Sequence, residues 1–202
     1  MIVVSDLHLD PDSSSFPRPI IDALEKWGVD CLGLTGDIIE YRRKVTSQEL
    51  ENLIARVFKE VLKIESLNRI FYSLSTSSHD PIIGETQKLN IGGKEIILVP
   101  GVIRLKVGGT EVSMAHGDYV CRHGTIARII DKIAEKLGRK HYIERLAKKK
   151  YGIRTQEWWI MGHTHFGFID ELNRVANPGS WKGKIGVNPS STILLITGNG
   201  VK

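Results

Sequence analysis

Short apolar runs alternate with amphipathic segments in the first third of the chain. Residues 2–4, 31–35 and 69–74 are compact runs of β-branched and other apolar side chains, which predict buried strands. Between the first two runs, residues 20–27 carry apolar side chains at helical spacing. Residues 46–62 predict a longer helix, because the segment opens with a Thr-x-x-Glu capping box and continues as one apolar stripe. This part of the chain therefore predicts alternating strands and helices.

The pattern changes in the middle of the chain, where three apolar runs follow one another without a helix between them. Residues 95–99, 102–107 and 111–114 predict strands. The pair Gly108-Gly109 predicts a hairpin between the last two of these strands. The alternation of strands and helices therefore gives way to a β-meander.

The last part of the chain begins with a helix and returns to strands. Residues 125–137 repeat isoleucine and leucine at helical spacing and stop at Gly138, which is typical of an amphipathic helix. Residues 139–154 are strongly basic. Residues 158–161 predict a buried strand, and residues 166–197 have the pattern of several short strands.

Together these elements predict an α/β fold. Two mixed sheets that pack on each other and carry helices on their outer faces would form a four-layer α/β/β/α sandwich. For a chain of 202 residues we expect a single domain over residues 1–202, with a basic helical segment at about 125–154.

The composition is ordinary for a water-soluble globular protein, with 41% hydrophobic and 25% charged residues. Part of the formal charge of +5 lies in residues 132–154, which either suit an anionic substrate or form a solvated helix face. The two cysteines, Cys31 and Cys121, do not make a disulfide framework. No apolar stretch approaches the roughly 20 residues of a membrane span, and no signal-peptide pattern opens the chain, so we expect a cytoplasmic protein.

Side chains that can bind metals follow the apolar runs. Five of the seven histidines lie in short clusters directly behind predicted strands. The clusters, with one further aspartate, are Asp6-Leu7-His8, Gly36-Asp37, Ser78-His79-Asp80, His116-Gly117-Asp118 and Gly162-His163-Thr164-His165. Alone, Asp37 would be a helix N-cap or turn residue, and His116 a hydrogen-bonded core residue. Their repetition at successive strand ends indicates a shared site.

The spacing within the clusters favours convergent side chains. In an extended segment, Asp6 and His8 project from the same face, and so do His163 and His165. Asp37 has two carboxylate oxygens and can therefore bridge two cations. Imidazole nitrogens mixed with carboxylate oxygens suit Mn, Fe, Zn or Co better than Ca. Four histidines and two aspartates are too many for one tetrahedral ion, but they suit two ions about 3.5–4 Å apart that share Asp37.

This succession of motifs resembles the calcineurin-like metallophosphoesterase superfamily, from Asp6 to about Trp181. The segment Asn177-Pro178-Gly179-Ser180-Trp181 is similar to the one that follows the last metal motif in bacterial and archaeal members. More weakly, His116-Gly117-Asp118 is similar to the form found in the lipid A precursor pyrophosphatase branch. The resemblance implies a phosphodiesterase or phosphatase in which a metal-bound hydroxide attacks phosphorus. Its cofactors would be two divalent cations, manganese in the first place, with iron, zinc, cobalt or nickel as alternatives.

The resemblance also implies a role for each residue. The ligands of the first metal would be Asp6, His8 and His165, the shared ligand would be Asp37, and the ligands of the second metal would be His116 and His163. His79 would face the scissile phosphate, and Asp80 would orient His79. The superfamily motif has asparagine where this chain has Ser78, so a shorter and weaker hydroxyl replaces an expected ligand of the second metal.

The substrate and the partners are less closely defined. Arg122 and His123, close behind His116, either contact the anionic end of the substrate or are ordinary loop residues. We expect a small-molecule or nucleotide phosphoester rather than nucleic acid, because no nucleic-acid-binding module is recognisable. Two alternatives are a nuclease that uses the basic segment to follow the phosphate backbone, and an interaction scaffold with weak or no catalysis. The Ser78 replacement favours the scaffold.

Overall fold

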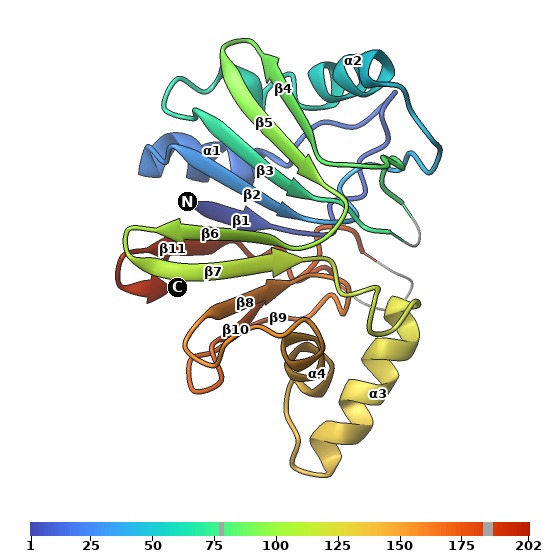
Figure 1. The fold of residues 1–202 in the computed structure, drawn as a ribbon, viewed down its shortest axis with the longest axis vertical. Helices are drawn as coiled ribbons and strands as arrows, with labels where there is room; N and C mark the ends of the chain where they lie inside the picture. Colours follow the sequence, from blue (N-terminus) through green and yellow to red (C-terminus); the bar gives the residue numbers. More distant parts are fainter. Residues whose placement is uncertain (77–78, 184–187) are drawn as a thin grey trace.

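Two β-sheets pack face to face between two pairs of helices in the computed structural model of this chain (Figure 1). The residues that the structure describes are 1–76, 79–183 and 188–202. Helices α1 (Arg18–Trp27) and α2 (Ser47–Val57) cover the outer face of the first sheet. Helices α3 (Gly124–Lys136) and α4 (Tyr142–Lys150) lie on the outer side of the second sheet. The four-layer α/β/β/α sandwich of two mixed sheets expected from the sequence is therefore confirmed.

The first sheet has seven strands, and its four central parallel strands end at one edge. In spatial order the strands are β12 (Gly200–Val201), β11 (Leu194–Thr197), β1 (Ile2–Val4), β2 (Cys31–Thr35), β3 (Arg69–Ser73), β5 (Lys94–Val99) and β4 (Gln87–Ile91). Strands β1, β2, β3 and β5 are parallel neighbours. The other three strands run antiparallel to their neighbours.

The second sheet has five strands, of which three are parallel. In spatial order they are β6 (Ile103–Val107), β7 (Thr110–Ala115), β8 (Trp158–Met161), β10 (Val175–Pro178) and β9 (Gly167–Asp170). Strands β7, β8 and β10 are parallel, whereas β6 and β9 close the two edges as antiparallel strands. The hairpin predicted at Gly108-Gly109 joins β6 to β7.

Side-chain alternation along the strands builds separate apolar layers on the two faces of each sheet. In β1, Ile2 packs toward the helices of the first sheet, whereas Val3 packs against the second sheet. In β8, Trp158 belongs to the layer between the sheets, whereas Trp159 belongs to the layer near α3 and α4. Because both strands are buried on both faces, they appear in the sequence as unbroken apolar runs.

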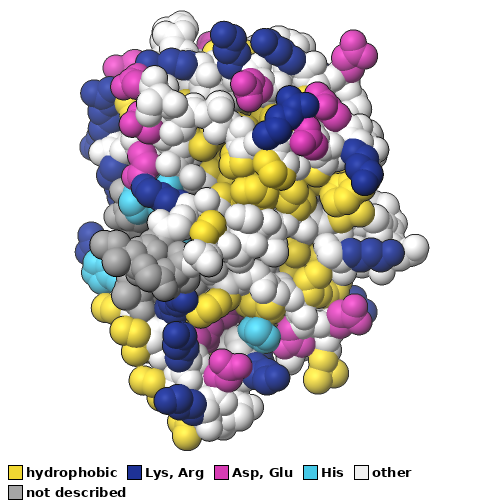
Figure 2. Space-filling model, turned by 180° about the vertical axis from the view of Figure 1, so that it is seen from behind, with side chains coloured by type: hydrophobic (Ala, Val, Ile, Leu, Met, Phe, Trp, Pro, Cys, Tyr) yellow, Lys and Arg dark blue, Asp and Glu magenta, His cyan; other side chains and the backbone are white. Residues whose placement is uncertain are grey.

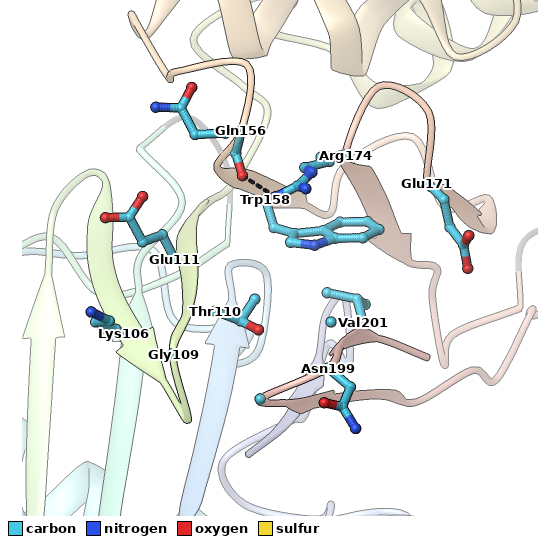
Figure 3. A pocket seen from close by; sticks show the side chains of 12 residues that line it. Lys106, Gly109, Thr110, Glu111, Gln156, Trp158, Glu171, Arg174, Asn199 and Val201 are labelled. Carbon is cyan, nitrogen blue, oxygen red and sulfur yellow. Dashed lines mark hydrogen bonds between the residues drawn. The ribbon is translucent and has the colours of Figure 1, made fainter.

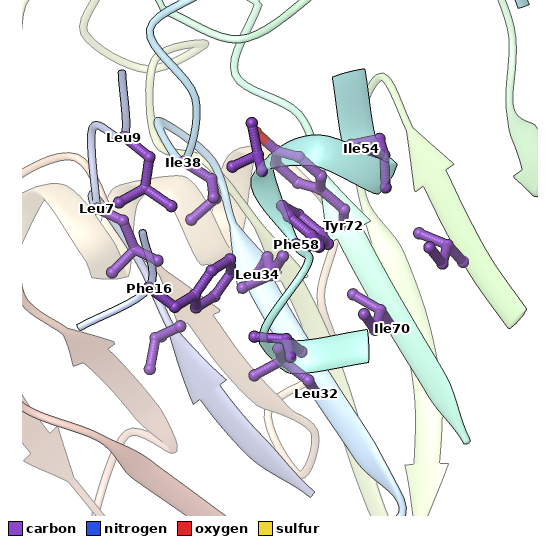
Figure 4. Packing of buried hydrophobic residues seen from close by; sticks show 14 of the residues in the cluster. Leu7, Leu9, Phe16, Leu32, Leu34, Ile38, Ile54, Phe58, Ile70 and Tyr72 are labelled. Atoms are coloured by element: carbon purple, nitrogen blue, oxygen red, sulfur yellow. The ribbon is translucent and has the colours of Figure 1, made fainter. Parts of the chain in front are cut away.

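The apolar layer under α2 also reaches the loops at the edge of the sheet (Figure 4). Phe16 and Phe58 pack edge to face, with their ring centroids 5.1 Å apart, and the ring of Tyr72 lies 6.1 Å from that of Phe58. The Tyr72 hydroxyl donates a hydrogen bond to the buried carboxylate of Asp80. The hydrophobic core is therefore tied directly to one of the segments that carry polar functional side chains.

The second helix is shorter than predicted, and one strand was not predicted. The capping box is present, because the Thr46 hydroxyl accepts from the Glu49 backbone N–H and the Glu49 carboxylate accepts from the Thr46 backbone N–H. The helix predicted over 46–62 nevertheless ends at Val57, and a short 3-10 turn at Val61–Lys63 continues its apolar stripe. Strand β4 was not predicted, because Gln87–Ile91 is largely polar and borders only β5.

The prediction of a β-meander in the middle of the chain is wrong. Strand β5 pairs with β3 and β4 in the first sheet, whereas β6 pairs with β7 in the second sheet. The chain therefore crosses from one sheet to the other between β5 and β6, which local sequence patterns do not reveal.

Among the described residues, every helix is too short or too polar to cross a bilayer.

Candidate metal centre

The parallel strands of the two sheets end on the same side of the sandwich, and potential metal ligands follow four of them. Asp6 follows β1, Asp37 follows β2, His116 follows β7 and His163 follows β8. Hydrogen bonds join these loops within the first sheet and between the two sheets. Within the first sheet, the Asp6 backbone N–H donates to the Gly36 carbonyl at 3.1 Å. The His163 backbone N–H donates to Asp6 Oδ2 at 3.0 Å. Hydrogen bonds from backbone N–H groups thus hold together segments that are remote in sequence.

The first cluster of potential ligands consists of Asp6, His8 and His165. One ligand atom from each residue lies within 4.8 Å of the others. His165 Nε2 is 3.0 Å from Asp6 Oδ1. His8 Nδ1 lies 3.0 Å from Glu40 Oε1, so His8 Nε2 is the ring atom available to an ion.

The second cluster consists of Asp6, Asp37 and His116, again with ligand atoms within 4.8 Å of one another. His116 Nε2 is 3.4 Å from Asp37 Oδ2 and 3.0 Å from Nδ1 of His163. The structure therefore brings His163 to the side of the second cluster. Asp6 is common to both clusters, which makes the two groups contiguous.

The outward-facing ring nitrogens of this cluster are held by backbone carbonyls. His116 Nδ1 lies 3.0 Å from the Thr35 carbonyl, and His163 Nε2 lies 2.5 Å from the Cys121 carbonyl. A carbonyl can only accept, so each ring donates from the nitrogen that faces away from the cluster. When the ring is neutral, the opposite nitrogen has the lone pair and faces the cluster. A hydrogen bond from the outer ring nitrogen to a neighbouring acceptor is the usual way in which a metal-binding histidine is oriented.

Five of these residues have a left-handed backbone conformation. Their φ angles are +52° for Asp6, +52° for His8, +51° for Asp37, +78° for His163 and +64° for His165. Aspartate and histidine are among the few non-glycine residues that enter this region, and each such residue costs about 1–3 kcal/mol. The expectation that the paired residues converge because their segments are extended is therefore wrong. Left-handed turns bring them together instead.

His79 and Glu40 form a third group beside the first cluster. His8, Glu40 and His79 each offer a ligand atom within 4.8 Å of the others. His79 Nδ1 lies 2.5 Å from Glu40 Oε2, and its Nε2 lies 3.9 Å from Asp37 Oδ2. Lys182 Nζ lies 2.8 Å from the other Glu40 oxygen. Glu40 was missed in the sequence, although it follows Asp37 by three residues.

Asp80 lies beneath the site, and the described hydrogen bonds of its carboxylate with backbone groups go to the turn that carries Asp37 and to Ser75. Its fully buried carboxylate accepts hydrogen bonds from the backbone N–H groups of Asp37, Ile38 and Ser75 at 2.7–2.9 Å. Burial, followed by the charge of Asp37, raises the pKa of Asp80 to about 6. In the described contacts Asp80 orients the turn that carries Asp37, and Glu40 holds the ring of His79.

Charges within the cluster are strongly coupled. Burial raises the pKa of Asp37, but His116 more than offsets this, and the pKa lies well below its usual range. Burial also opposes ionisation of Asp6, yet His165 brings the pKa of Asp6 below its ordinary value. For His116, burial lowers the pKa but the Asp37 and Asp6 carboxylates raise it well above its usual value. The cluster is therefore an anionic centre that attracts a positive charge.

Two buried atoms fit a bound cation. Among the described residues, His8 Nε2 and Asp37 Oδ1 are buried and have no hydrogen-bond partner. Buried polar atoms without a partner are rare in proteins, and each one needs an explanation. Both atoms belong to the clusters above, where divalent cations would satisfy them. The mixture of imidazole and carboxylate donors suits Mn, Fe, Zn, Co or Ni.

Two predicted site residues, Arg122 and His123, have no described contact with these clusters. Arg122 and His123 are exposed on the loop between β7 and α3. Within the described part of the chain, neither side chain makes a hydrogen bond or an ion pair with the clusters. Ser78 lies outside the described residues.

A second buried carboxyl group supports the His163–His165 loop from below. Glu144 on α4 is fully buried, and its Oε1 accepts hydrogen bonds from the Thr164 hydroxyl and from Nδ2 of Asn177, the latter at 3.2 Å. Asn177 Nδ2 is also 2.9 Å from the Thr164 hydroxyl. Burial, followed by the charge of Asp131, raises the pKa of Glu144 to about 8. The loop is thus fixed by a polar network that reaches into a helix of the basic segment.

A surface pocket of about 540 Å³ lies away from these residues (Figure 3). Its lining includes Thr110 and Glu111 at the start of β7, Trp158 at the start of β8, and Arg174. The ligand clusters follow the opposite ends of the same two strands. The pocket is therefore separate from the candidate metal centre.

Comparison with known families gives one match that spans the chain. The family described as the calcineurin-like phosphoesterase superfamily domain matches residues 1–200. Among curated proteins, no sequence matches this chain.

Solved structures with a similar fold include two proteins called Vps29. Vps29 from Cryptosporidium parvum is 15% identical, with a TM-score of 0.51, and the alignment covers 99% of this chain and 86% of that one. Wild-type Vps29 from Entamoeba histolytica, in complex with zinc, is 16% identical, with a TM-score of 0.49, and the alignment covers 100% of this chain and 89% of that one. At 15% identity, the likeness to the Cryptosporidium parvum protein concerns the fold alone.

Proposed function

The chain belongs to the calcineurin-like phosphoesterase superfamily, and we propose that it is a metal-dependent phosphoester hydrolase with a dinuclear centre. The observation that carries the proposal is the convergence of two buried carboxylates and several histidines at one edge of the sandwich. The unpartnered His8 Nε2 and Asp37 Oδ1 support it further, because a cation is the partner that such atoms lack.

The residues fall into two ligand sets in this proposal. Asp6, His8 and His165 would hold one cation, and His116 and His163 would hold the other. Asp37 would be shared between the two cations. Asp80 acts on Asp37 through the backbone, because its carboxylate accepts from the Asp37 N–H and so fixes the turn.

The chemistry divides between the cations and the side chains. When bound, the cations neutralise phosphoryl oxygens and lower the pKa of a bound water toward about 7. His79 is the candidate general acid: Glu40 holds its Nδ1 at 2.5 Å and leaves Nε2 facing the cluster. A protonated His79 can pass the proton on Nε2 to the leaving oxygen. Glu40 is therefore a positioning residue for His79 in this mechanism.

We infer a small-molecule or nucleotide phosphoester as the substrate and manganese as the first metal to test. Arg122 and His123 follow His116 by a few residues and are exposed, so they are available to an anionic substrate group. The scaffold alternative is favoured by one observation, the serine at position 78 where the superfamily motif has asparagine.

The test is to exchange the shared ligand. Asn enters the left-handed backbone region as readily as Asp, so Asp37→Asn should keep the φ of +51° while it removes the anionic bridge. We expect Mn-dependent hydrolysis of bis-p-nitrophenyl phosphate to fall by more than about a hundredfold. Elemental analysis after incubation with Mn should give two equivalents for the natural chain and fewer for the variant.

The matched control is Asp12→Asn, which changes an exposed carboxylate that pairs only with Arg56 among its described contacts. It should leave both metal content and hydrolysis unchanged. Full activity in Asp37→Asn would refute the bridging role. A folded natural chain that binds no metal and cleaves neither mono- nor diester test compounds would refute the proposal and support the scaffold.

A further inference from the structure

Helix α3 leaves a stripe of large apolar side chains in contact with solvent. Ile126, Ile129, Ile130, Ile133 and Leu137 have exposed fractions between 38% and 75%, and they make up half of the ten exposed large hydrophobic residues among those described. Their spacing places them on one face of the helix. Figure 2 shows hydrophobic side chains in a row along the edge of the molecule that α3 forms.

Ala127 and Ala134 mark the side of α3 that faces the protein, because both are buried. Successive helical residues are rotated by 100°, so the isoleucine stripe lies about a quarter-turn away from these alanines. The stripe is therefore not a core face that happens to be thinly covered. It is a second apolar face with no partner among the described residues.

The surroundings of the stripe are strongly basic. Residues 122–154 contain eleven lysines and arginines against three acids, whereas the whole chain has 28 against 23. The remainder of the chain therefore carries a net negative charge of 3. Two of the three acids, Asp131 and Glu144, are buried, which leaves Glu135 as the exposed one. Lys132 and Lys136 are exposed directly beside the stripe.

The amino end of α3 is joined to the candidate metal centre. The Cys121 carbonyl, three residues before the helix, lies 2.5 Å from His163 Nε2. In the second turn, the Arg128 guanidinium lies 4.5 Å from the ring centroid of Phe166, which follows His165 directly. Whatever surface the stripe contacts is therefore held close to the clustered ligands.

We propose that α3 docks this protein on an anionic lipid bilayer, with its apolar stripe at the headgroup–acyl boundary and its lysines and arginines on the lipid headgroups. An apolar stripe flanked by basic side chains is the pattern of helices that lie in a membrane interface. Long basic side chains bury their stems and keep their charges at the headgroups. The docked helix brings the metal centre to the level of the headgroup phosphates.

A second copy of the chain fits this surface less well. Two α3 helices packed stripe to stripe would bring the exposed lysines and arginines of both copies together with one exposed acid from each. Like charges at close range oppose association, whereas an anionic bilayer offers the opposite charge over the whole surface. Charge complementarity therefore selects the bilayer.

The experiment is co-sedimentation of the full chain with vesicles of phosphatidylcholine that contain about 30% phosphatidylglycerol, compared with pure phosphatidylcholine. We expect binding to the anionic vesicles that weakens as salt rises from about 0.1 M to about 0.5 M. The double substitution Ile129→Ser and Ile133→Ser should lower the apparent partition coefficient by about tenfold or more. Lys132→Glu with Lys136→Glu should lower it by a similar factor.

Matched controls change exposed residues elsewhere on the molecule. Trp27→Ser with Leu172→Ser removes apolar side chains that are 45% and 93% exposed, and Lys59→Glu with Lys63→Glu reverses two exposed charges. Both controls should bind vesicles within about twofold of the natural chain. Hydrolysis of a soluble diester should be unchanged in the stripe variant, so vesicle binding and catalysis can fail independently.

Three outcomes would overturn the proposal. The stripe variant could bind anionic vesicles as well as the natural chain. Light scattering could show a dimer that the stripe substitutions convert to a monomer, which would make this face a self-association surface. Salt-sensitive binding to duplex DNA without binding to vesicles would assign the basic residues to nucleic acid.

Discussion

The left-handed backbone of the ligand residues is the most telling feature at the scale of single residues. Asp6, His8, Asp37, His163 and His165 are five of the eight non-glycine residues with positive φ among those described. At about 1–3 kcal/mol each, these conformations destabilise the fold unless something compensates. Backbone hydrogen bonds between the loops compensate in part, and cation binding would add to them. Strain that is concentrated in the proposed ligands supports a functional origin.

Glu144 gives a prediction about pH. Its pKa is about 8 in the folded protein against an ordinary 4.5, so the folded state holds a proton that the unfolded state releases between these values. The free energy of unfolding therefore falls as pH rises from about 4.5 to about 8. Glutamine resembles the protonated acid, so Glu144→Gln should remove this loss. We expect the variant to be more stable by about 1–4 kcal/mol at pH 8.5 and little changed at pH 5, as measured by urea unfolding.

The control for this prediction is Glu135→Gln, which changes an exposed acid on α3. It should alter the stability by about 0.5 kcal/mol or less at both pH values. A gain in Glu144→Gln that is equal at pH 5 and pH 8.5 would contradict the assignment of the pH dependence to Glu144.

The sequence predicts which residues gather at the site better than how they are held. Asp6, Asp37, His116 and the two loop histidines are recognisable because each follows a buried strand, and parallel strands end at one edge. Glu40 was not recognisable, because its contact with His79 joins two loops remote in sequence. Such a contact depends on tertiary structure, which no local spacing encodes.

At the scale of elements, the turn between β2 and the Asp37 segment gives a sharp prediction. Gly36 has φ +79°, and a Cβ there would lie 2.5 Å from Cβ of His116. Gly138, which follows α3, has a similar φ of +76°, but a Cβ atom added there would have no atom within 4 Å. Both alanine substitutions place a side chain on a left-handed backbone, which costs about 1–2 kcal/mol. Only Gly36→Ala also clashes with the His116 side chain. We expect Gly36→Ala to be less stable than Gly138→Ala by about 1–3 kcal/mol.

Two measurements check this pair. Thermal or urea unfolding compares the stabilities of the two variants under identical conditions. Metal content after incubation with Mn should fall in Gly36→Ala and stay unchanged in Gly138→Ala, because only the former displaces a proposed ligand. Equal stability and equal metal content in both would show that the His116 contact is unimportant.

Elements buried on both faces were the ones predicted most closely. Strands β1, β2 and β8 have the bounds expected from their apolar runs. Strand β4 at the edge was missed, because few of its side chains are buried and its polar residues do not separate it from a loop.

Helix α3 shows another limit of sequence patterns. Periodicity correctly predicted an amphipathic helix, but it does not say whether the rest of the protein, a partner or a membrane covers the apolar face.

At the scale of the whole molecule, the candidate metal centre joins the two sheets. Asp6 and Asp37 belong to loops of the first sheet, whereas His116 and His163 belong to loops of the second. Cations held between them would link the two halves of the sandwich. Since ligands from both sheets are in place only in the folded chain, binding should stabilise the fold by mass action.

This linkage predicts that metal stabilisation grows with pH. Without metal, the Asp37 and Asp6 carboxylates raise the pKa of His116, and its proton supplies the positive charge among them. That contribution is present at low pH and is lost as pH rises through the raised pKa. A cation needs the neutral His116 ring, so it competes with this proton. The affinity of the protein for the cation should therefore rise by up to about tenfold per pH unit for each proton released.

The rise in melting temperature caused by Mn should therefore be larger at pH 8 than at pH 6, and a chelator should reverse it. Calorimetry in two buffers of different ionisation enthalpy counts the released protons. Asp37→Asn should show a smaller Mn effect at both pH values, whereas a Mn effect independent of pH in the natural chain would separate the metal from His116.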